Sequence, residues 1–214
     1  MNGRLHLFVA SALLACAAAP AQAYDAGDWI FRAGVGGVEP KSNNLDLSDE
    51  VDSVKVNVDS AMSMTLTGTY MFTPNWAIDI LAAYPFNHDI KLEVNGESAK
   101  IAETDHLPPT VSIQYHFMPS GEIQPYAGLG VNFTTFFSTD TVSELSSEGI
   151  GLDLDNSFGL AAQLGVDWLL GDRWLINADL RWINIETDAT LGGEDVGTVE
   201  IDPWVYSINI GYRF

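Results

Sequence analysis

The chain has 214 residues, a length that fits one domain, and its 29 acidic against 9 basic residues give a net charge of −20. This acidic excess excludes a nucleic-acid partner, because binding to a phosphate backbone needs clustered lysine and arginine side chains. Hydrophobic residues make up 47% of the chain and aromatic residues 11%, which excludes a disordered protein, since such chains have too little apolar surface to fold.

The chain begins with the features of a secretory signal peptide, which we assign to residues 1–23. Arg4 precedes an apolar, alanine-rich run of fifteen residues, too short to span a bilayer as a helix. The tripeptide AQA then supplies a small-x-small cleavage motif, so we expect one mature domain over residues 24–214. The motif "LLAC", which ends at the only cysteine, leaves a lipoprotein signal as the alternative. Cleavage after Ala23 would leave a mature chain without disulfide or thiol chemistry.

Eight later stretches carry apolar residues at every second position, the period of a β-strand with two different faces. They cover residues 29–38, 62–72, 76–86, 110–117, 127–133, 158–168, 174–182 and 204–214. The short segments "TPN", "MPSGE" and "GD" join the second to the third stretch, the fourth to the fifth and the sixth to the seventh, whereas the other connections are long. This alternation predicts an all-β fold, an eight-stranded antiparallel transmembrane β-barrel with short periplasmic turns and long extracellular loops.

A soluble barrel of the lipocalin type has the same strand number and the same period, and it is the main alternative. Soluble barrels turn their apolar face inward, whereas here the more uniform apolar face carries aromatic residues beside the short turns. Such positions are typical of the aromatic girdle of a membrane barrel: Trp29, Phe72, Trp76, Phe117, Trp168 and Trp174. They favour a barrel whose outer face contacts the lipids of the outer membrane.

The last strand ends on an alternating aromatic stripe, and we expect Tyr212 and Phe214 at the periplasmic girdle. A terminal phenylalanine after such a stripe resembles the assembly signal of outer-membrane barrels. We therefore expect this end of the chain to be recognised by the outer-membrane assembly machinery.

The long loops hold many of the acidic residues, which solvation of these loops explains. Binding of divalent cations at the lipopolysaccharide surface is the alternative. Histidine, cysteine and carboxylate residues show no spacing of a metal site, and no Ser/His/acid set converges. Ser112 and His116 lie about 13 Å apart along one predicted strand, too far for a hydrogen bond. We therefore predict no metal, no cofactor and no enzymatic activity.

The predicted inner face combines charged and apolar side chains. Eight strands leave an interior just wide enough for side chains, so a filled structural lumen and a narrow passage for small hydrophobic molecules both remain open. The residues that we assign to the lumen and its constriction are Met71, Asp79, Leu81, Ala83, Asp179, Arg181 and Ile183.

Three prolines bear on this choice. Pro85 lies within the third predicted strand, and Pro108 and Pro109 begin the fourth. Proline cannot donate to a ladder of hydrogen bonds, and a closed barrel has no edge strand to accommodate it. We therefore expect interrupted pairing between these strands on the long-loop side. Either the strands extend above the membrane there, or the wall has a lateral opening toward the outer leaflet.

Several stretches resemble the OmpW family of small outer-membrane barrels, among them "LAAYPFNHDI", "HLPPTVSIQYHF", "PYAGLGVNFTTFF" and "DPWVYSINIGYRF". The resemblance covers nearly all of the mature chain. It implies a narrow hydrophobic channel for passive uptake of small hydrophobic molecules, which leave laterally through the wall into the outer membrane and bypass the lipopolysaccharide layer. Pro85 matches the position of that lateral opening. The expected location is the outer membrane of a Gram-negative bacterium, with both termini in the periplasm.

The chain departs from the family at the expected constriction. The resemblance implies closure of the lumen by a leucine and a tryptophan, of which Leu81 matches the first, whereas Arg181 stands at the second. We expect Arg181 to pair with Asp179, or with Asp79 or Asp167, and to form a polar plug. A lumen that conducts water or ions is the other possibility. The alternative function is a non-transporting structural or interaction barrel whose acidic loops bind cations, lipopolysaccharide or a receptor partner.

Overall fold

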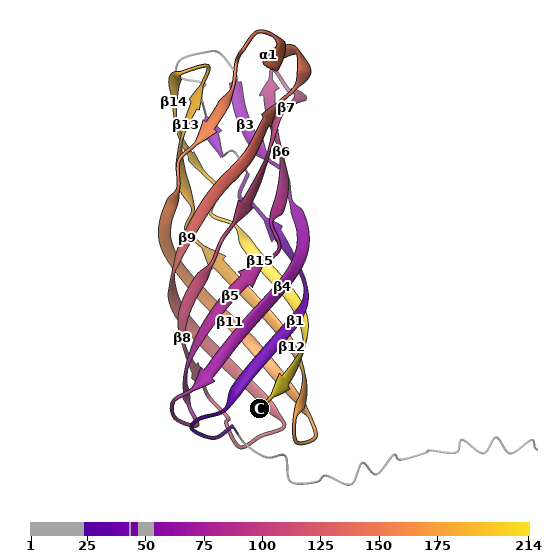
Figure 1. The fold of residues 1–214 in the computed structure, drawn as a ribbon, viewed down its shortest axis with the longest axis vertical. Helices are drawn as coiled ribbons and strands as arrows, with labels where there is room; N and C mark the ends of the chain where they lie inside the picture. The colour runs from indigo at the N-terminus through magenta and orange to yellow at the C-terminus, as the bar shows by residue number, and fades with distance from the viewer. Residues whose placement is uncertain (1–23, 43, 47–53) are drawn as a thin grey trace, which may run out of the picture.

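The computed structural model describes residues 24–42, 44–46 and 54–214, so the predicted signal peptide lies outside the described residues. Eight strands form a closed antiparallel barrel, in the order in which they follow one another along the chain. They are β1 (Trp29–Glu39), β4 (Ala61–Met71), β5 (Trp76–Ala83), β8 (Thr110–His116), β9 (Ile123–Thr141), β11 (Ser157–Leu170), β12 (Trp174–Ile183) and β15 (Trp204–Arg213). The predicted fold is therefore confirmed (Figure 1).

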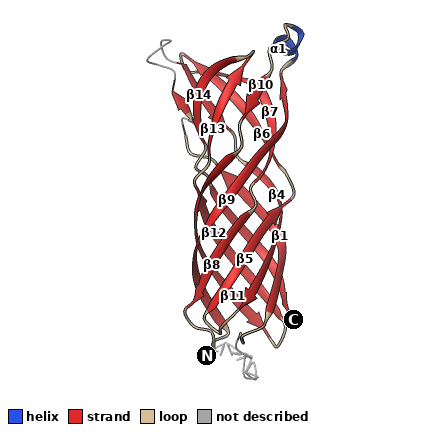
Figure 2. Ribbon diagram, turned by 60° about the vertical axis from the view of Figure 1, so that its left-hand side comes forward, coloured by secondary structure: helices blue, strands red, loops and turns tan. Residues whose placement is uncertain are grey.

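Closure of the barrel comes from β1, which pairs with β4 on one side and with β15 on the other. Ala33, for example, lies between Leu66 and Ile210. Closure satisfies the backbone groups that hydrocarbon cannot. Phe214 continues this seam, because its backbone N–H donates to the carbonyl oxygen of Trp29 at 2.8 Å. Both ends of the barrel chain therefore meet at the short-turn end (Figure 2).

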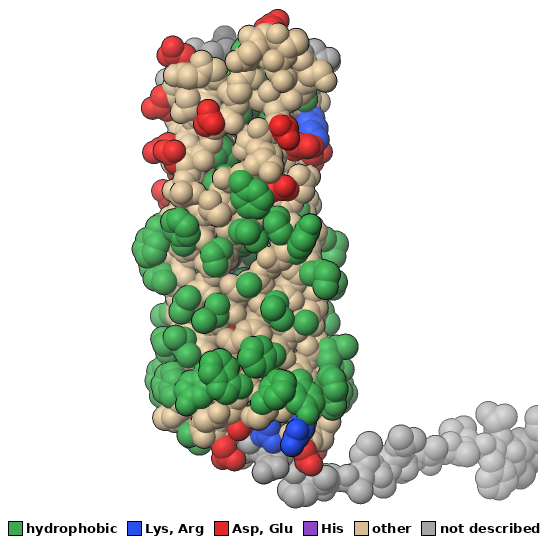
Figure 3. All heavy atoms as spheres, viewed as in Figure 1, with side chains coloured by type: hydrophobic (Ala, Val, Ile, Leu, Met, Phe, Trp, Pro, Cys, Tyr) green, Lys and Arg blue, Asp and Glu red, His purple; other side chains and the backbone are tan. Residues whose placement is uncertain are grey.

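The outer face of the barrel is apolar, and the inner face is largely polar, as the two-residue period predicts. Figure 3 shows hydrophobic side chains over the lower part of the visible face, with aspartate and glutamate side chains gathered above them. Leu129 and Ile210 are 73% and 62% exposed on the outer face. Such a continuous apolar surface needs lipid, because soluble proteins rarely expose patches of this size.

Two barrel strands differ by more than two residues from their predicted extents. The third predicted strand ends at Ala83 as β5, and a new strand begins at Phe86. Pro85 lies in the break, where its missing N–H cannot continue the ladder. The fifth strand is longer than predicted, because β9 continues to Thr141 and pairs with β7 (Glu97–Leu107) above the barrel.

The long loops fold into a second layer of strands above the barrel, which we call the extension. It contains β2 (Leu45–Asp46), β3 (Val54–Val58), β6 (Phe86–Val94), β7 (Glu97–Leu107), β10 (Leu152–Leu154), β13 (Glu186–Leu191) and β14 (Glu194–Glu200). A short helix, α1 (Ser143–Ser147), follows β9 at the rim. The upper part of β9 pairs with β7, so the extension is continuous with the barrel wall (Figure 2).

No helix in the described part of the chain is long and apolar enough to cross a membrane.

The turn between β6 and β7 explains why this loop is a hairpin. Asn95 and Gly96 have φ values of 53° and 84°, both in the left-handed region. A two-residue turn with two positive φ angles matches the twist of paired strands, and Asn-Gly is its preferred sequence. The strands on either side pair from Phe86 with His106 to Val94 with Glu97.

We predict that Gly96→Val loosens the tip of this hairpin, because a side chain in the left-handed region costs about 1–2 kcal/mol. Hydrogen–deuterium exchange should become faster around the turn and stay unchanged in the barrel strands. Ser98→Val is the matched control, because it places the same side chain on an extended strand next to the turn. Equal exchange in the two variants would show that the turn conformation does not hold the hairpin.

Candidate functional site

The extension encloses an apolar cavity of about 220 Å³, which we call the upper cavity. Its wall comes from several strands of the extension and consists mainly of aliphatic side chains, among them Leu45, Ile90, Leu152, Leu191, Val199 and Ile201. Below it, an apolar cluster that includes Ile183, Ile185 and Val205 continues to the top of the barrel. The cavity therefore offers a small molecule an almost wholly apolar environment.

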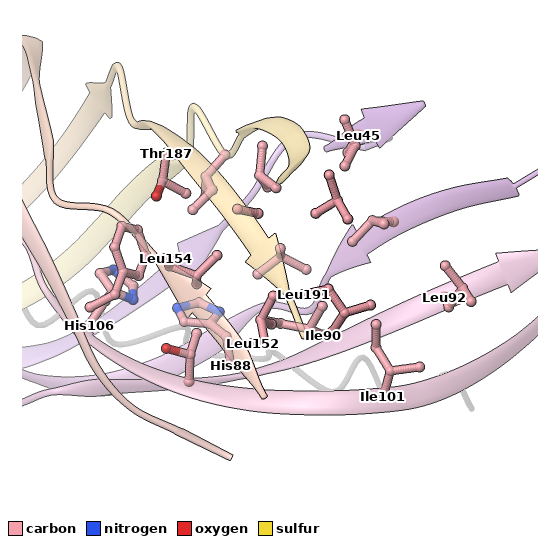
Figure 4. Close-up of a pocket in the computed structure, with 18 of the residues that line it drawn as sticks. Leu45, His88, Ile90, Leu92, Ile101, His106, Leu152, Leu154, Thr187 and Leu191 are labelled. Carbon is pink, nitrogen blue, oxygen red and sulfur yellow. The ribbon is translucent and has the colours of Figure 1, made fainter. Parts of the chain in front are cut away.

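Two histidines stand at one end of the upper cavity (Figure 4). The rings of His88 and His106 stack at a centroid distance of 4.7 Å. Phe86 and Phe136 flank His106 at 5.6 and 6.0 Å. Burial lowers the pKa of His88, and burial together with the neighbouring His88 lowers the pKa of His106 to about 3. Both imidazoles are therefore neutral near pH 7.

The barrel lumen beneath the upper cavity contains buried ion pairs. Arg181 donates from Nη2 to Asp79 at 2.8 Å and from Nε to Asp179 at 2.7 Å. These are two of the partners predicted from the sequence, so the pairing of Arg181 is confirmed. The guanidinium and the Asp79 carboxylate are 2% and 0% exposed. A buried charge is tolerated only when it is paired in this way.

A second arginine lies one layer closer to the short turns. Arg32 donates from Nε and Nη2 to the two carboxylate oxygens of Asp167, at 3.0 and 2.5 Å, in a bidentate pair. Its Nη1 donates to Thr69 at 2.5 Å, and Thr69 in turn donates to Asp79 at 2.6 Å. The Tyr24 hydroxyl also donates to Asp167, at 2.8 Å. Asp167 thus pairs with Arg32 rather than with Arg181.

Neutral polar side chains join the two arginine centres into one network. Asn177 donates to Asp167 at 2.8 Å and to the Tyr126 hydroxyl at 2.9 Å. Tyr126 and Gln163 both donate to Asp179, at 2.7 and 2.6 Å. The ring of Tyr126 fits because residue 165 is glycine, where a Cβ atom would stand 2.3 Å from the tyrosine hydroxyl. We call this connected set of arginine, aspartate and neutral partners the polar network.

The predicted lumen residues lie at four levels rather than at one constriction. Met71 is fully buried in the lowest apolar cluster, with Tyr24, Ile30 and Leu175. Asp79, Asp179 and Arg181 form part of the polar network above it. Leu81 is buried two residues above Asp79 on β5, at the next inward position. Ala83 and Ile183 pack higher still, with the apolar cluster below the upper cavity. A chain position alone does not predict the height of an inward side chain, because the strands are tilted.

The three prolines lie together where the barrel continues into the extension. The last ladder pair of β5 and β8 is Leu81 with Thr110, and the first pair of β6 and β7 is Phe86 with His106. No ladder pair links residues 82–85 with residues 107–109, although the structure describes both segments. The predicted interruption is therefore present. We call this gap, which contains Pro85, Pro108 and Pro109, the proline seam.

The flanks of the proline seam remain bonded. The N–H of Tyr84 donates to the carbonyl oxygen of Met64 at 2.9 Å, which joins this segment to β4. On the other side, the carbonyl oxygen of Pro109 accepts from the N–H of Phe133 at 3.1 Å. Each segment of the seam is thus held by its outer neighbour, whereas no ladder pair holds residues 82–85 to residues 107–109.

Sequence reasoning missed several members of both sites. It assigned His88 to a long loop and gave His106 no role, and it did not include Tyr24, Tyr126, Gln163 or Asn177 in the lumen set. The Asn-Gly dipeptide at the tip of β6 and β7 was an available signal for the hairpin that carries both histidines. Asn177 shares one strand face with Asp179 and Arg181, and this two-residue spacing was a signal for its inward position.

The acidic residues of the extension lie partly on its outer surface and make ion pairs with lysine. Lys100 contacts Asp89 and Glu103, each at 2.7 Å. Among the described residues, no group of three or more His, Cys, Asp or Glu side chains could hold a metal ion.

Comparisons with known proteins agree with this architecture. A family model described as the OmpW family matches residues 25–214. Outer membrane protein W of Vibrio cholerae serotype O1 is 40% identical over 94% of this chain and 95% of its own length. The crystal structure of outer membrane protein OprG from Pseudomonas aeruginosa aligns with a TM-score of 0.81 and 37% identity, over 91% of this chain and 99% of OprG.

A more distant relative is outer membrane protein AlkL of Ectopseudomonas oleovorans, which is 29% identical over 89% of this chain and 84% of its own length. The solid-state NMR structure of AlkL in DMPC lipid bilayers aligns with a TM-score of 0.65 and 25% identity, over 100% of this chain and 97% of that one.

We predict that Arg181→Ala opens the polar network to water and ions. The substitution leaves the carboxylates of Asp79 and Asp179 buried without this cation, which costs about 3–5 kcal/mol. Single-channel conductance in planar bilayers should rise, and the unfolding temperature should fall. Arg173→Ala is the matched control, because Arg173 is exposed at the short-turn end. Unchanged conductance in Arg181→Ala would contradict a plug.

A compensated variant separates the loss of charge balance from the loss of volume. Arg181→Met combined with Asp79→Asn and Asp179→Asn fills the same space without buried charges. It should recover much of the lost stability, since an apolar or neutral replacement of a buried ion pair is often tolerated.

Proposed function

The chain belongs to the OmpW family of outer-membrane proteins, and from this premise we propose that it is a non-enzymatic channel for passive uptake of small hydrophobic molecules. The observation that carries the proposal is an apolar upper cavity that lies above a closed polar network, with an apolar cluster between the two. The cavity has the chemistry of a binding site for a hydrophobic molecule, because such sites are concave and mostly apolar.

The polar network argues against a straight path through the barrel. A hydrophobic molecule that moved downward would have to separate Arg181 from Asp79 and Asp179, which are nearly inaccessible to solvent. Separation of buried charges without new partners costs several kcal/mol. An apolar molecule offers no hydrogen bonds in return, so its easier route from the upper cavity is sideways.

The proline seam is the exit in this proposal. Its segments lack ladder pairs with one another, so they can separate at lower cost than any paired strands. Ile80 and Val111, just below the seam, are 52% and 40% exposed on the lipid-facing surface. A molecule that leaves at this height would enter the outer leaflet. In this orientation the short turns face the periplasm and the extension faces outward. The molecule would therefore cross the polar lipopolysaccharide layer inside the extension before it leaves.

The alternative is a structural or interaction barrel, in which the acidic extension binds a cation, lipopolysaccharide or a protein receptor. The surface carboxylates of the extension favour such contacts only through their charge, and lysines such as Lys100 already pair with part of them. An interaction barrel has no need for an enclosed apolar cavity. Uptake measurements therefore discriminate between the two functions.

We predict that Pro85→Ala reduces uptake of an apolar probe, such as a medium-chain alkane, several-fold. Alanine restores an N–H in the seam, which can form a ladder hydrogen bond with the opposite segment and hold the wall closed. The measurement compares the initial rate of probe uptake in cells that express the wild type, the variant or no barrel.

The matched control is Pro119→Ala, since Pro119 lies at a short turn, where its carbonyl oxygen accepts from Tyr24 and Gln124. It should leave uptake unchanged. Heat-modifiable migration on gels checks that both variants assemble. Equal uptake with and without the barrel would reject transport, whereas full uptake by Pro85→Ala would reject the seam as the exit.

We also propose that Tyr212 and Phe214 form the signal read by the outer-membrane assembly machinery. Phe214 is 69% exposed, and its ring contacts those of Tyr212 and Phe31 at 4.7 and 5.6 Å. An exposed aromatic ring at the free end of the closing strand is available to a partner protein before the barrel closes.

Phe214→Ala should lower the amount of assembled barrel in the outer membrane severalfold, while Phe72→Ala, an exposed aromatic at the same end, should have a smaller effect. Quantitative immunoblots of membrane fractions measure the difference. Equal losses in the two variants would mean that the chain end has no special role.

A further inference from the structure

His88 presents an unused hydrogen-bond acceptor. Its Nδ1 lies 2.5 Å from the backbone carbonyl oxygen of Asp59. A carbonyl oxygen only accepts, so Nδ1 must carry the hydrogen of the neutral ring. In that tautomer Nε2 has a free lone pair and no hydrogen. Nε2 is buried and has no hydrogen-bond partner in the structure.

The free nitrogen lies on the inward side of β6, covered by its neighbours in the cavity wall, so a ligand in the cavity reaches it once these side chains shift. Phe86, His88 and Ile90 are the buried positions at the start of β6, whereas the residues between them point outward. Nε2 lies at the distal end of the ring, away from the wall that holds Nδ1. His88 lines the upper cavity, and Figure 4 shows its ring near His106 at one end of that cavity. The rest of the wall is mainly aliphatic, and it also contains Phe136, Thr104 and Thr187.

The surroundings keep this nitrogen a neutral acceptor. Burial lowers the pKa of His88, although the nearby Asp59, Asp89 and Asp105 oppose the shift. The stacked ring of His106 is also neutral, because burial lowers its pKa to about 3. A buried acceptor without a partner is unfavourable. A ligand that donates a hydrogen bond to it therefore binds with a more favourable free energy than the matching hydrocarbon.

The cavity volume limits the size of such a ligand. Its volume of about 220 Å³ exceeds the roughly 150 Å³ of an engineered protein cavity that binds benzene. One aromatic ring with a short alkyl group, or an aliphatic chain of similar volume, therefore fits. A carboxylate would place its own acceptor oxygens against Nε2, and an ammonium group would lose its hydration in an apolar wall. Neither is favoured.

We propose that the upper cavity selects neutral, hydrogen-bond-donating hydrophobic molecules, such as alkylphenols and alcohols, over the matching hydrocarbons, and that Nε2 of His88 accepts the ligand's hydroxyl hydrogen. This inference rests on the proposed uptake function and specifies its substrate class. His88 would be a specificity-determining residue, whereas the aliphatic wall would bind both kinds of molecule.

The test uses 4-ethylphenol and ethylbenzene, which share one carbon skeleton and differ by a hydroxyl group. Calorimetry measures their binding to the full barrel in lipid nanodiscs, with empty nanodiscs subtracted. The wild type should bind 4-ethylphenol about tenfold more tightly, equivalent to about 1.4 kcal/mol. His88→Phe should abolish this preference and leave ethylbenzene affinity within about twofold, because the stacked aromatic ring is retained.

His106→Phe is the matched control and should keep the preference, since it leaves His88 and Asp59 in place. Loss of the Asp59 contact could prevent His88→Phe from assembling. His88→Asn then replaces it, because the asparagine amide can still donate to the Asp59 carbonyl oxygen but has no atom at the Nε2 position. In wild-type protein labelled with 15N-histidine, the Nε2 resonance of His88 should shift with 4-ethylphenol and not with ethylbenzene.

Equal wild-type affinity for the two compounds, or a preference that survives in both His88 variants, would overturn the inference. Cellular uptake of the two compounds keeps this failure distinct from failure of the proposed function. Uptake of both without discrimination would leave the channel in place and reject the role of His88. Uptake of neither above that of barrel-free cells would reject the channel itself.

Discussion

Backbone hydrogen bonding is the constraint on which this architecture depends, because hydrocarbon offers no partner for an exposed N–H or C=O group. The lipid-facing strands meet it by closing on themselves, with β9 paired to β11 and β1 paired to β15. A closed ring of eight strands leaves an interior that side chains nearly fill. The proline seam, the break in the wall that we propose as the exit, lies where the barrel leaves the apolar band and the extension begins.

The filled interior explains the polar network. Inward positions of a narrow barrel cannot stay hydrated, so each charge needs a partner inside the wall. Arg32 and Arg181 lie in two layers of the lumen and both pair with Asp79. The distances from guanidinium nitrogen to carboxylate oxygen are 3.8 and 2.8 Å. The same pairing that stabilises the barrel closes it to a straight flow of solute. In the proposed function, stability and the direction of transport therefore have a common physical origin.

The barrel could be predicted from the sequence, but the partners inside it could not. The two-residue period identifies β1 and β15 directly, because lipid on one side and polar side chains on the other enforce a strict alternation. The partner of Arg32 is Asp167, 135 positions away on a strand that does not pair with β1. Contacts across the lumen depend on strand tilt and stagger, which no local pattern encodes. The hairpin of β6 and β7 was missed for another reason, since its outer face is polar and its turn signal, Asn95-Gly96, is brief.

The position of the histidine pair gives the upper cavity and the proline seam a common element. His88 lies three residues after Pro85 on β6, and His106 lies two residues before Pro108 on β7. Phe86 and His106 form the first ladder pair above the seam, so the rings that end the cavity stand on the strands that bound the proposed exit. In the proposed function, a ligand in the cavity beside His88 contacts these strands where pairing has just begun. A single hydrogen bond keeps such a ligand weakly held, and passage through a channel requires binding that is weak enough to allow release.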